Sequence, residues 1–446
     1  MWETVRNAFK IKDIRQRLLF TFIALVIVRL GSQLPIVGVD TDAVKTLFNN
    51  SNNGALDFIN TLTGGSFTSF SIFALNISPY ITASIIMQLL TIAIPKLEEM
   101  QKDGEEGRKK IAEYTRYLNV GLSIVEGLAM VIGFSNQNVL TAGVTATTIL
   151  TTVTALTAGS AFLMWLGERI TQNGVGNGIS IILVINIVSR MPSDLMTLYT
   201  KFIGSVGVGG KIVAATAIIA IIVGMVVFIV LLQGGQRRIP VQYAKKVQGR
   251  KMVGGQSSHI PLKVNTAGVI PVIFAGSLLS FPVVIASFFG VSPASGAGAT
   301  ISQKLLKICS QQSWCNFKSL GEFKYTLGLL IYIILVIFFA YFYTSITFNP
   351  IEVSNNMKKQ GGFIPGIRPG KPTTDFLTKI LNNVIFIGAA GLTIIAVIPI
   401  FFSGAFNADV SFGGTSLIII VGVVIETMKQ VESQMLVRHY KGFLND

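Results

Sequence analysis

The chain has 446 residues, of which 51% are hydrophobic and only 13% charged. A soluble globular protein carries about 25% charged residues, and single cores stop growing at roughly 300 residues. The composition therefore excludes an ordinary soluble protein. The remaining charges are unequal, with 36 Lys and Arg against 21 Asp and Glu and a net charge of +15.

The first expected element is a short amphipathic helix on the membrane surface. Trp2, Val5 and Phe9 alternate with charged residues at helical spacing, a pattern typical of interfacial helices; the alternative is a frayed, solvated tail. The apolar run that follows is too long for the core of a signal peptide and lacks a small-residue cleavage site. We expect it to be retained as the first transmembrane span.

Ten apolar runs follow one another along the chain. Long, continuous apolar runs are typical of membrane-spanning helices, whereas strands of a membrane barrel are shorter and alternate. The sequence therefore predicts an all-α polytopic membrane protein with ten transmembrane helices. The predicted spans are 18–39, 72–94, 117–134, 144–166, 179–188, 212–232, 267–291, 325–348, 381–402 and 416–425.

The spans suggest two related halves of five helices. Runs five and ten are both short, and ten residues cover about 15 Å of a hydrocarbon core about 30 Å thick. Pro79 in the second span and Pro271 in the seventh both fall one turn inside a helix, where proline is tolerated. Because five spans separate the halves, they would be inverted relative to each other, as in proteins with a pathway at the repeat interface.

The expected pathway is lined by aliphatic residues rather than by ionisable ones. Few ionisable residues lie in or at the ends of spans, and the Pro- and Gly-punctuated segments are rich in isoleucine. A dry aliphatic constriction excludes ions by dewetting; the alternative is that these isoleucines only pack helix against helix. The segment 58–70, before the second span, is too polar to cross the membrane. It is either a short half-helix entering from the outer side or an ordinary loop.

Basic residues concentrate on one side of the predicted membrane. The N-terminus and every second loop hold 27 of the 36, which places both termini in the cytoplasm by the positive-inside rule. Two of these loops, 233–265 and 349–375, are long, basic and rich in Gly and Pro turns. They suit an anionic partner, whether lipid headgroups, acidic protein or RNA phosphates; equally, they could serve only to fix the topology.

We find no pattern of an enzyme or a metal site. The chain has two cysteines and two histidines, too few for the usual zinc or haem ligand sets. The glycine-rich stretch 366–373 lacks the first glycine and the hydroxyl residue of a phosphate loop. We therefore expect no catalytic residues, no metal and no cofactor.

A series of short motifs, in this order along the whole chain, resembles the bacterial SecY family. The motifs are Gln33-Leu34-Pro35-Ile36, Ile72-Phe73-Ala74-Leu75 with Pro79-Tyr80-Ile81, Gly107-Arg108-Lys109-Lys110, Gly176-Asn177-Gly178-Ile179-Ser180, Gln242-Tyr243-Ala244-Lys245, Pro261-Leu262-Lys263-Val264-Asn265, Ala267-Gly268-Val269-Ile270-Pro271, Phe348-Asn349-Pro350, Gly366-Ile367-Arg368-Pro369-Gly370 and Gly413-Gly414-Thr415-Ser416-Leu417.

This resemblance implies the channel subunit of the Sec protein translocase, a clamshell of five plus five helices that opens sideways between helices two and seven. Such a channel would pass unfolded secretory proteins across the bacterial plasma membrane and release membrane segments into lipid. The family's pore ring matches Ile81, Ile85, Ile179, Leu183, Ile273 and Ile419. Its plug matches the segment 58–70, with Phe58, Gly64, Gly65, Phe67 and Phe70.

The resemblance also implies partners. The two basic loops match those that dock the ribosome or the SecA motor ATPase, with Arg250, Lys251 and Arg368 as candidate contacts. SecE and SecG, signal peptides, translocating polypeptides and membrane lipids complete the expected partners. Cys309 and Cys315, in a long outer loop, would either close a local disulfide or remain free thiols.

The expected organisation is a cytoplasmic N-terminal segment (1–17), an N-terminal half (18–198), a C-terminal half (199–430) and a cytoplasmic tail (431–446). The rival interpretation is a secondary transporter for a small solute. The scarcity of ionisable groups inside the membrane and the large basic loops argue against that rival.

Overall fold

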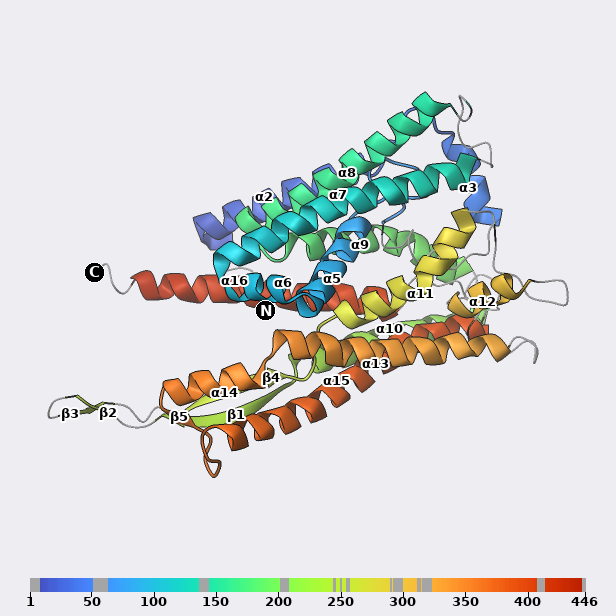
Figure 1. Ribbon diagram of the computed structural model, residues 1–446. Helices are drawn as coiled ribbons and strands as arrows, with labels where there is room; N and C mark the ends of the chain where they lie inside the picture. The colour runs from blue at the N-terminus through green and yellow to red at the C-terminus, as the bar shows by residue number, and fades with distance from the viewer. Residues whose placement is uncertain are drawn as a thin grey trace.

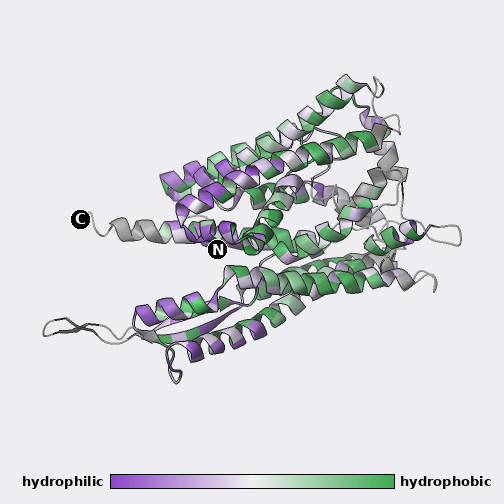
Figure 2. Cartoon of the chain, in the orientation of Figure 1, coloured by the Kyte–Doolittle hydropathy of each residue, from purple (hydrophilic) through white to green (hydrophobic). Residues whose placement is uncertain are grey.

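The computed structural model describes residues 9–50, 63–135, 143, 145–200, 208–243, 246–248, 251–253, 257–288, 291, 300–310, 314, 323–406 and 414–442. Most of these residues are helical, and the long helices lie roughly side by side (Figure 1). Hydrophilic residues gather at one end of the bundle, which also carries a small sheet (Figure 2). We call this the sheet end, and the opposite end the far end.

Seven of the described helices belong to the first part of the chain, and α10 begins the second part. α2, α7 and α8 lie on one side of the bundle, with α5 and α9 closer to its middle (Figure 1). The helices are α2 (Lys12–Gly31), α3 (Thr41–Asn50), α5 (Ser78–Ala93), α6 (Pro95–Lys102), α7 (Glu105–Ser135), α8 (Ala146–Asn173), α9 (Gly178–Leu198) and α10 (Val208–Gly234).

The second part continues from α10, which packs against α15 and α16. α10, α13 and α15 lie on the other side of the bundle, while α11 and α16 lie between the two groups (Figure 1). These elements are α11 (Ile270–Phe288), α12 (Ile301–Cys309), the 3-10 turn η3 (Phe323–Thr326), α13 (Leu327–Thr347), α14 (Pro350–Lys359), α15 (Lys371–Phe406) and α16 (Gly414–Gly442).

Each of the ten predicted apolar runs coincides with part of one helix. Among the described residues, α7, α8, α13 and α15 are long and apolar enough to cross a membrane unaided, and the bent pair α5–α6 makes a fifth. Shorter apolar stretches lie in α9, α10 and α11. The two short runs belong to longer helices, because α9 continues past Arg190 and α16 continues past Glu426.

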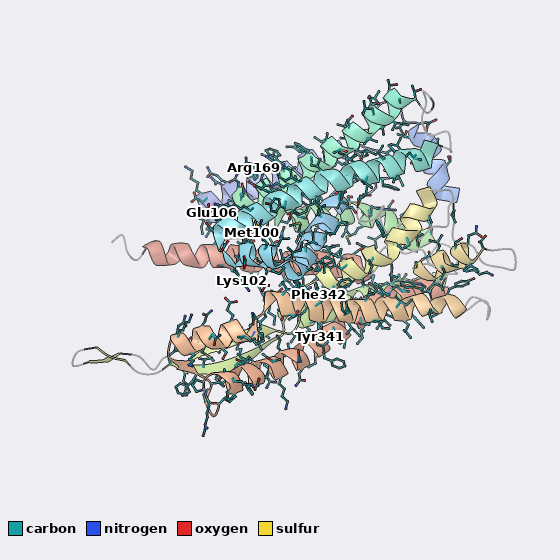
Figure 3. The ribbon with its side chains drawn as sticks, viewed as in Figure 1. Met100, Lys102, Glu106, Arg169, Tyr341 and Phe342 are labelled. Carbon is teal, nitrogen blue, oxygen red and sulfur yellow. The ribbon has the colours of Figure 1, made fainter. Side chains whose placement is uncertain are left out.

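Proline marks a sharp turn between α5 and α6. The two helices meet at an angle of 102°, and Pro95, which has no backbone N–H, begins α6. The bend turns the chain at the sheet end and leads it into α7, against which both helices pack. Met100, Lys102 and Glu106 lie at this corner (Figure 3).

The two long basic loops join in one antiparallel sheet, which adds a β element to the predicted all-α bundle. β1 (Gln236–Tyr243) pairs with β4 (Ser257–Lys263) from the same loop and with β5 (Gly362–Phe363) from the other. A second hairpin, β2 (Lys246–Gln248) and β3 (Lys251–Val253), extends the first loop. Of this sheet region, the sequence predicted only the Gly and Pro turns, such as those of the second loop at 361–370.

The sheet is fixed to the bundle by its own small core. Ile239 and Val241 alternate with exposed residues along β1 and are buried against Leu377 of α15 and Met357 of α14. Each such buried side chain contributes about 1.5–3 kcal/mol. The paired strands β1, β4 and β5 therefore form a platform packed on α14 and α15 rather than a loose connection.

Polar contacts join α7 and α8 within the apolar bundle. Ser123 Oγ donates to Ser160 Oγ at 3.1 Å, and Arg116 Nε lies 2.8 Å from Glu168 Oε1. In a membrane such pairs satisfy polar groups that lipid cannot. They hold two neighbouring helices of the first part of the chain together.

Candidate functional site

Four helices converge on a small group of aliphatic side chains in the middle of the bundle. α5 and α9 belong to the first part of the chain, and α11 and α16 to the second. Five of its residues, from α9, α11 and α16, are each less than a tenth exposed, and Ile81 from α5 packs against them and is partly buried. We call these six residues the central aliphatic cluster: Ile81, Leu183, Ile187, Ile273, Ile419 and Val423. Four more partly buried residues pack around it: Ile181, Val184, Val269 and Ile420.

The structure brings four of the six predicted ring residues into this cluster: Ile81, Leu183, Ile273 and Ile419. Ile179 lies one turn before Leu183 and packs in a neighbouring core around Ile182, which Ile81 also contacts. Ile85, one turn further along α5, is half-buried and belongs to neither group.

Three residues of the cluster, Ile81, Leu183 and Ile273, lie near the N-termini of their helices, α5, α9 and α11. Ile81 and Ile273 each lie two residues after a proline in the first turn of their helix, which fits the fixed backbone angle of proline. α9 begins with Asn177, whose side-chain oxygen accepts hydrogen bonds from the backbone N–H of Ile179 at 3.2 Å and of Ser180 at 3.5 Å. This N-cap fixes the start of the helix that carries Leu183.

The segment 63–70 lies beside the cluster, against α9. Gly64 has a φ of +66°, and a Cβ added there would lie 2.8 Å from the backbone oxygen of Asn186. The segment forms a series of turns; the alternative of a half-helix is wrong for these residues. Phe58 of the predicted plug lies outside the described residues.

Two phenylalanines anchor this segment in the first half of the bundle. Phe67 and Phe70 are 4% and 1% exposed and pack with residues of α7 and α8, such as Met130 and Leu156. Gly65, in contrast, has no neighbour within 4 Å of an added Cβ. The segment is thus attached at one end by aromatic packing and meets α9 at Gly64.

Arg29 and Asn186 both contact the same segment, and neither was predicted to do so from the sequence. Arg29 Nη1 donates to the carbonyl oxygen of Gly64 at 3.3 Å from the end of α2. Asn186 is 2% exposed, and its Oδ1 accepts no hydrogen bond from the described residues. The available signal was a lone polar residue inside an apolar run, which is costly in a membrane and so often has a function.

Of the predicted docking residues, only Arg368 can be described in full. It is exposed in a turn between Gly366 and Gly370, both of which have positive φ, and its carbonyl accepts a hydrogen bond from Thr373 Oγ1 at 2.8 Å. Lys251 begins β3, and Arg250 lies outside the described residues. Because β1 pairs with β5, the turn carrying Arg368 adjoins the loop that carries the other two.

The predicted cysteine pair is only half described. Cys309 ends α12 and is partly buried, which raises the pKa of its thiol. Cys315 lies outside the described residues, so the disulfide stays a prediction. No cluster of three or more metal-ligating side chains occurs in the part of the chain that the structure describes.

Comparison with known proteins shows which family this architecture belongs to. The SecY family model matches residues 71–428, and the protein translocase subunit SecY of Halalkalibacterium halodurans is 43% identical over the full length of both chains. The chain belongs to the SecY family. The SecY subunit of Streptomyces coelicolor is 45% identical, with 98% of each chain covered.

Solved structures agree with the SecY fold. A structure described as that of a protein conducting channel matches with a TM-score of 0.62 and 18% identity, covering 95% of this chain and 93% of that one. Sec61 in a canine ribosome-channel complex matches with a TM-score of 0.58 and 17% identity, covering 95% and 93%. The chain is therefore a multi-pass membrane protein and the protein-conducting subunit of a translocase, not an enzyme.

Proposed function

We propose that the central aliphatic cluster is the closed constriction of the channel. Its residues come from both parts of the chain and are all aliphatic. An aliphatic constriction excludes water and ions without binding a passing polypeptide tightly. Ile85 and Ile179, which lie one turn away from the cluster on α5 and α9, would contact the same polypeptide above or below it.

The segment 63–70 serves as a second barrier in this proposal. It packs on α9 at Asn186, one turn beyond Leu183, and it must move before a chain can pass. Its contacts at Gly64 are one backbone approach and one hydrogen bond. This limited attachment at Gly64 is compatible with release of that end from α9, while Phe67 and Phe70 keep the other end packed against α7 and α8.

We further propose that residues 18–198 and 199–430 act as two halves of a clamshell. α5 and α9 contribute to the cluster from the first half, and α11 and α16 from the second. Separating the halves would part the cluster and open a route between α5 and α11, through which apolar segments could leave into lipid. This is the route that the family resemblance implies.

The sheet end faces the cytoplasm in this proposal, with both termini on that side of a bacterial plasma membrane. The platform of β1, β4 and β5 would receive a ribosome, as the related canine channel does, or the SecA motor. SecE and SecG are the proposed small membrane subunits. The energy for transport would come from such a partner.

An uptake experiment in vesicles distinguishes protein transport from the alternative function, transport of a small solute. Vesicles containing this chain and its partners should take up an unfolded secretory polypeptide when the motor and ATP are supplied. Vesicles with the chain alone should show no saturable uptake of amino acids, sugars or ions. Saturable solute uptake by the chain alone, together with failure to import any secretory polypeptide, would establish the rival.

A further inference from the structure

α12, at the far end of the bundle, is an amphipathic helix. Its N-terminus is fixed by a capping box, in which the side chains of Thr300 and Gln303 each accept a backbone hydrogen bond of the other residue. Ile301 and Leu305 are four residues apart and share one face, whereas Gln303 and Lys307 lie on the opposite face.

The orientation of α12 is opposite to that of a surface helix in a soluble protein. Such a helix turns its apolar face inward, but Ile301 and Leu305 are 77% and 58% exposed. Lys307, on the other face, contacts the protein, with its Nζ 4.8 Å from the centre of the Tyr325 ring. Three further residues of α12 are partly buried: Leu306, Ile308 and Cys309. Ile301 and Leu305 are therefore the apolar residues of α12 that point away from the bundle.

The helix is held in this orientation by Trp314. This residue is fully buried; its Nε1 donates to the carbonyl oxygen of Ile308 at 2.7 Å, and its ring lies 5.6 Å from that of Tyr332 in α13. An added Cβ at Gly328 would collide with both Trp314 and the Ile308 carbonyl. Since α12 is locked to the start of α13, it cannot rotate to hide its apolar face.

The exposed face of α12 adjoins a surface that must face lipid. α12 packs beside α11 and the beginning of α13 (Figure 1). α13 exposes an apolar stripe along its N-terminal half, formed by Leu327, Leu330, Ile334 and Phe338. A transmembrane helix exposes such a stripe to acyl chains. The apolar face of α12 extends this surface at the far end.

We propose that α12 is an interfacial helix that inserts Ile301 and Leu305 among the acyl chains of the leaflet at the far end. Lys304 flanks this face, as basic residues do on other membrane-surface helices, and can reach lipid phosphates. The loop between α11 and α13 is thereby fixed to the membrane next to the outlet of the channel. This inference concerns a surface outside the central aliphatic cluster and does not depend on it.

The test places a photoreactive diazirine analogue of leucine at position 305 of the full chain. The assembled complex is reconstituted in vesicles of phosphatidylethanolamine and phosphatidylglycerol containing radiolabelled phosphatidylethanolamine. The same residue at position 330 of α13 is the lipid-facing reference, and at position 307 it reports the opposite face of α12.

We expect lipid adducts at position 305 in a yield similar to that at position 330 and several-fold higher than at position 307. The same probe at position 301 should behave as at 305. Adducts at 305 mainly with a protein, either a small subunit or a second copy, would overturn the proposal. Equal, low lipid labelling at 305 and 307 would also overturn it, since the face would then lie in water.

Discussion

At the scale of single residues, adjacent buried positions on α16 belong to different hydrophobic cores, one of which is the central aliphatic cluster. Ile419 and Ile418 are neighbours on α16, with exposed fractions of 2% and 0%. Ile419 belongs to the cluster, whereas Ile418 packs in the core of the second part of the chain with Ile229 and Leu417. If the cluster is the seal, as we propose, substitution of Ile419 should affect sealing and stability, and substitution of Ile418 stability alone.

This difference predicts unequal leaks from the same substitution. A hydroxyl without a partner costs about 1–3 kcal/mol at either buried site, so both Ile419→Ser and Ile418→Ser should destabilise the protein. Only Ile419→Ser should wet the constriction and let ions through the resting channel, measured as conductance in planar bilayers. Equal leaks from the two variants would contradict the assignment of the cluster as the seal.

Gly64 and Gly65 provide a second matched comparison. Both have positive φ, so alanine at either position costs about 1–2 kcal/mol of backbone strain. Only at position 64 would the new Cβ press on Asn186, adding about 1–3 kcal/mol of overpacking. Gly64→Ala should therefore displace the segment 63–70 and raise the resting leak above that of Gly65→Ala. A leak no higher in Gly64→Ala would show that this contact does not hold the barrier.

At the scale of elements, the proposed docking surface at the sheet end is built from two loops that share one sheet. The loops 233–265 and 349–375 share strands and pack on α14 and α15. The sequence predicted their charge and their turns, because both are local properties. The pairing of β1 with β5 depends on residues more than a hundred positions apart, which no local pattern specifies.

Arg368 is the residue of this platform with the clearest expected effect. Reversing its charge in Arg368→Glu should reduce translocation several-fold and weaken its dependence on salt, because charges at an interface steer association. Expression and membrane insertion should stay unchanged. Lys379→Glu, also exposed but on α15, is the control with the same charge change. Equal losses in the two variants would assign the effect to net charge rather than to docking.

The helix boundaries were predictable where hydropathy alone decides them. α13 follows its predicted span to within two residues at each end. α9 was predicted as ten residues and contains 21, since Arg190 and Pro192 lie within the helix. Hydropathy marks where a helix meets lipid and fails where protein neighbours shield its polar turns.

At the scale of the whole molecule, the fold and the channel could be inferred from the order of motifs, but the central cluster could be assigned only in part. Four of the six predicted ring residues meet, and Ile187 and Val423 join them without prior indication. The sequence gives the rotation of each helix only approximately. Which residue of two adjacent turns reaches the centre depends on how four helices pack.

The central claim is that a translocating polypeptide passes through the aliphatic cluster. The most direct test is photocrosslinking from position 273 in α11, with a secretory polypeptide arrested in transit by a folded domain at its end. Position 330, on the exposed stripe of α13, is the control outside the pathway. We predict a strong crosslink to the arrested polypeptide from position 273 and none from position 330. No crosslink from position 273 during active translocation, or equal crosslinks from both positions, would contradict the account.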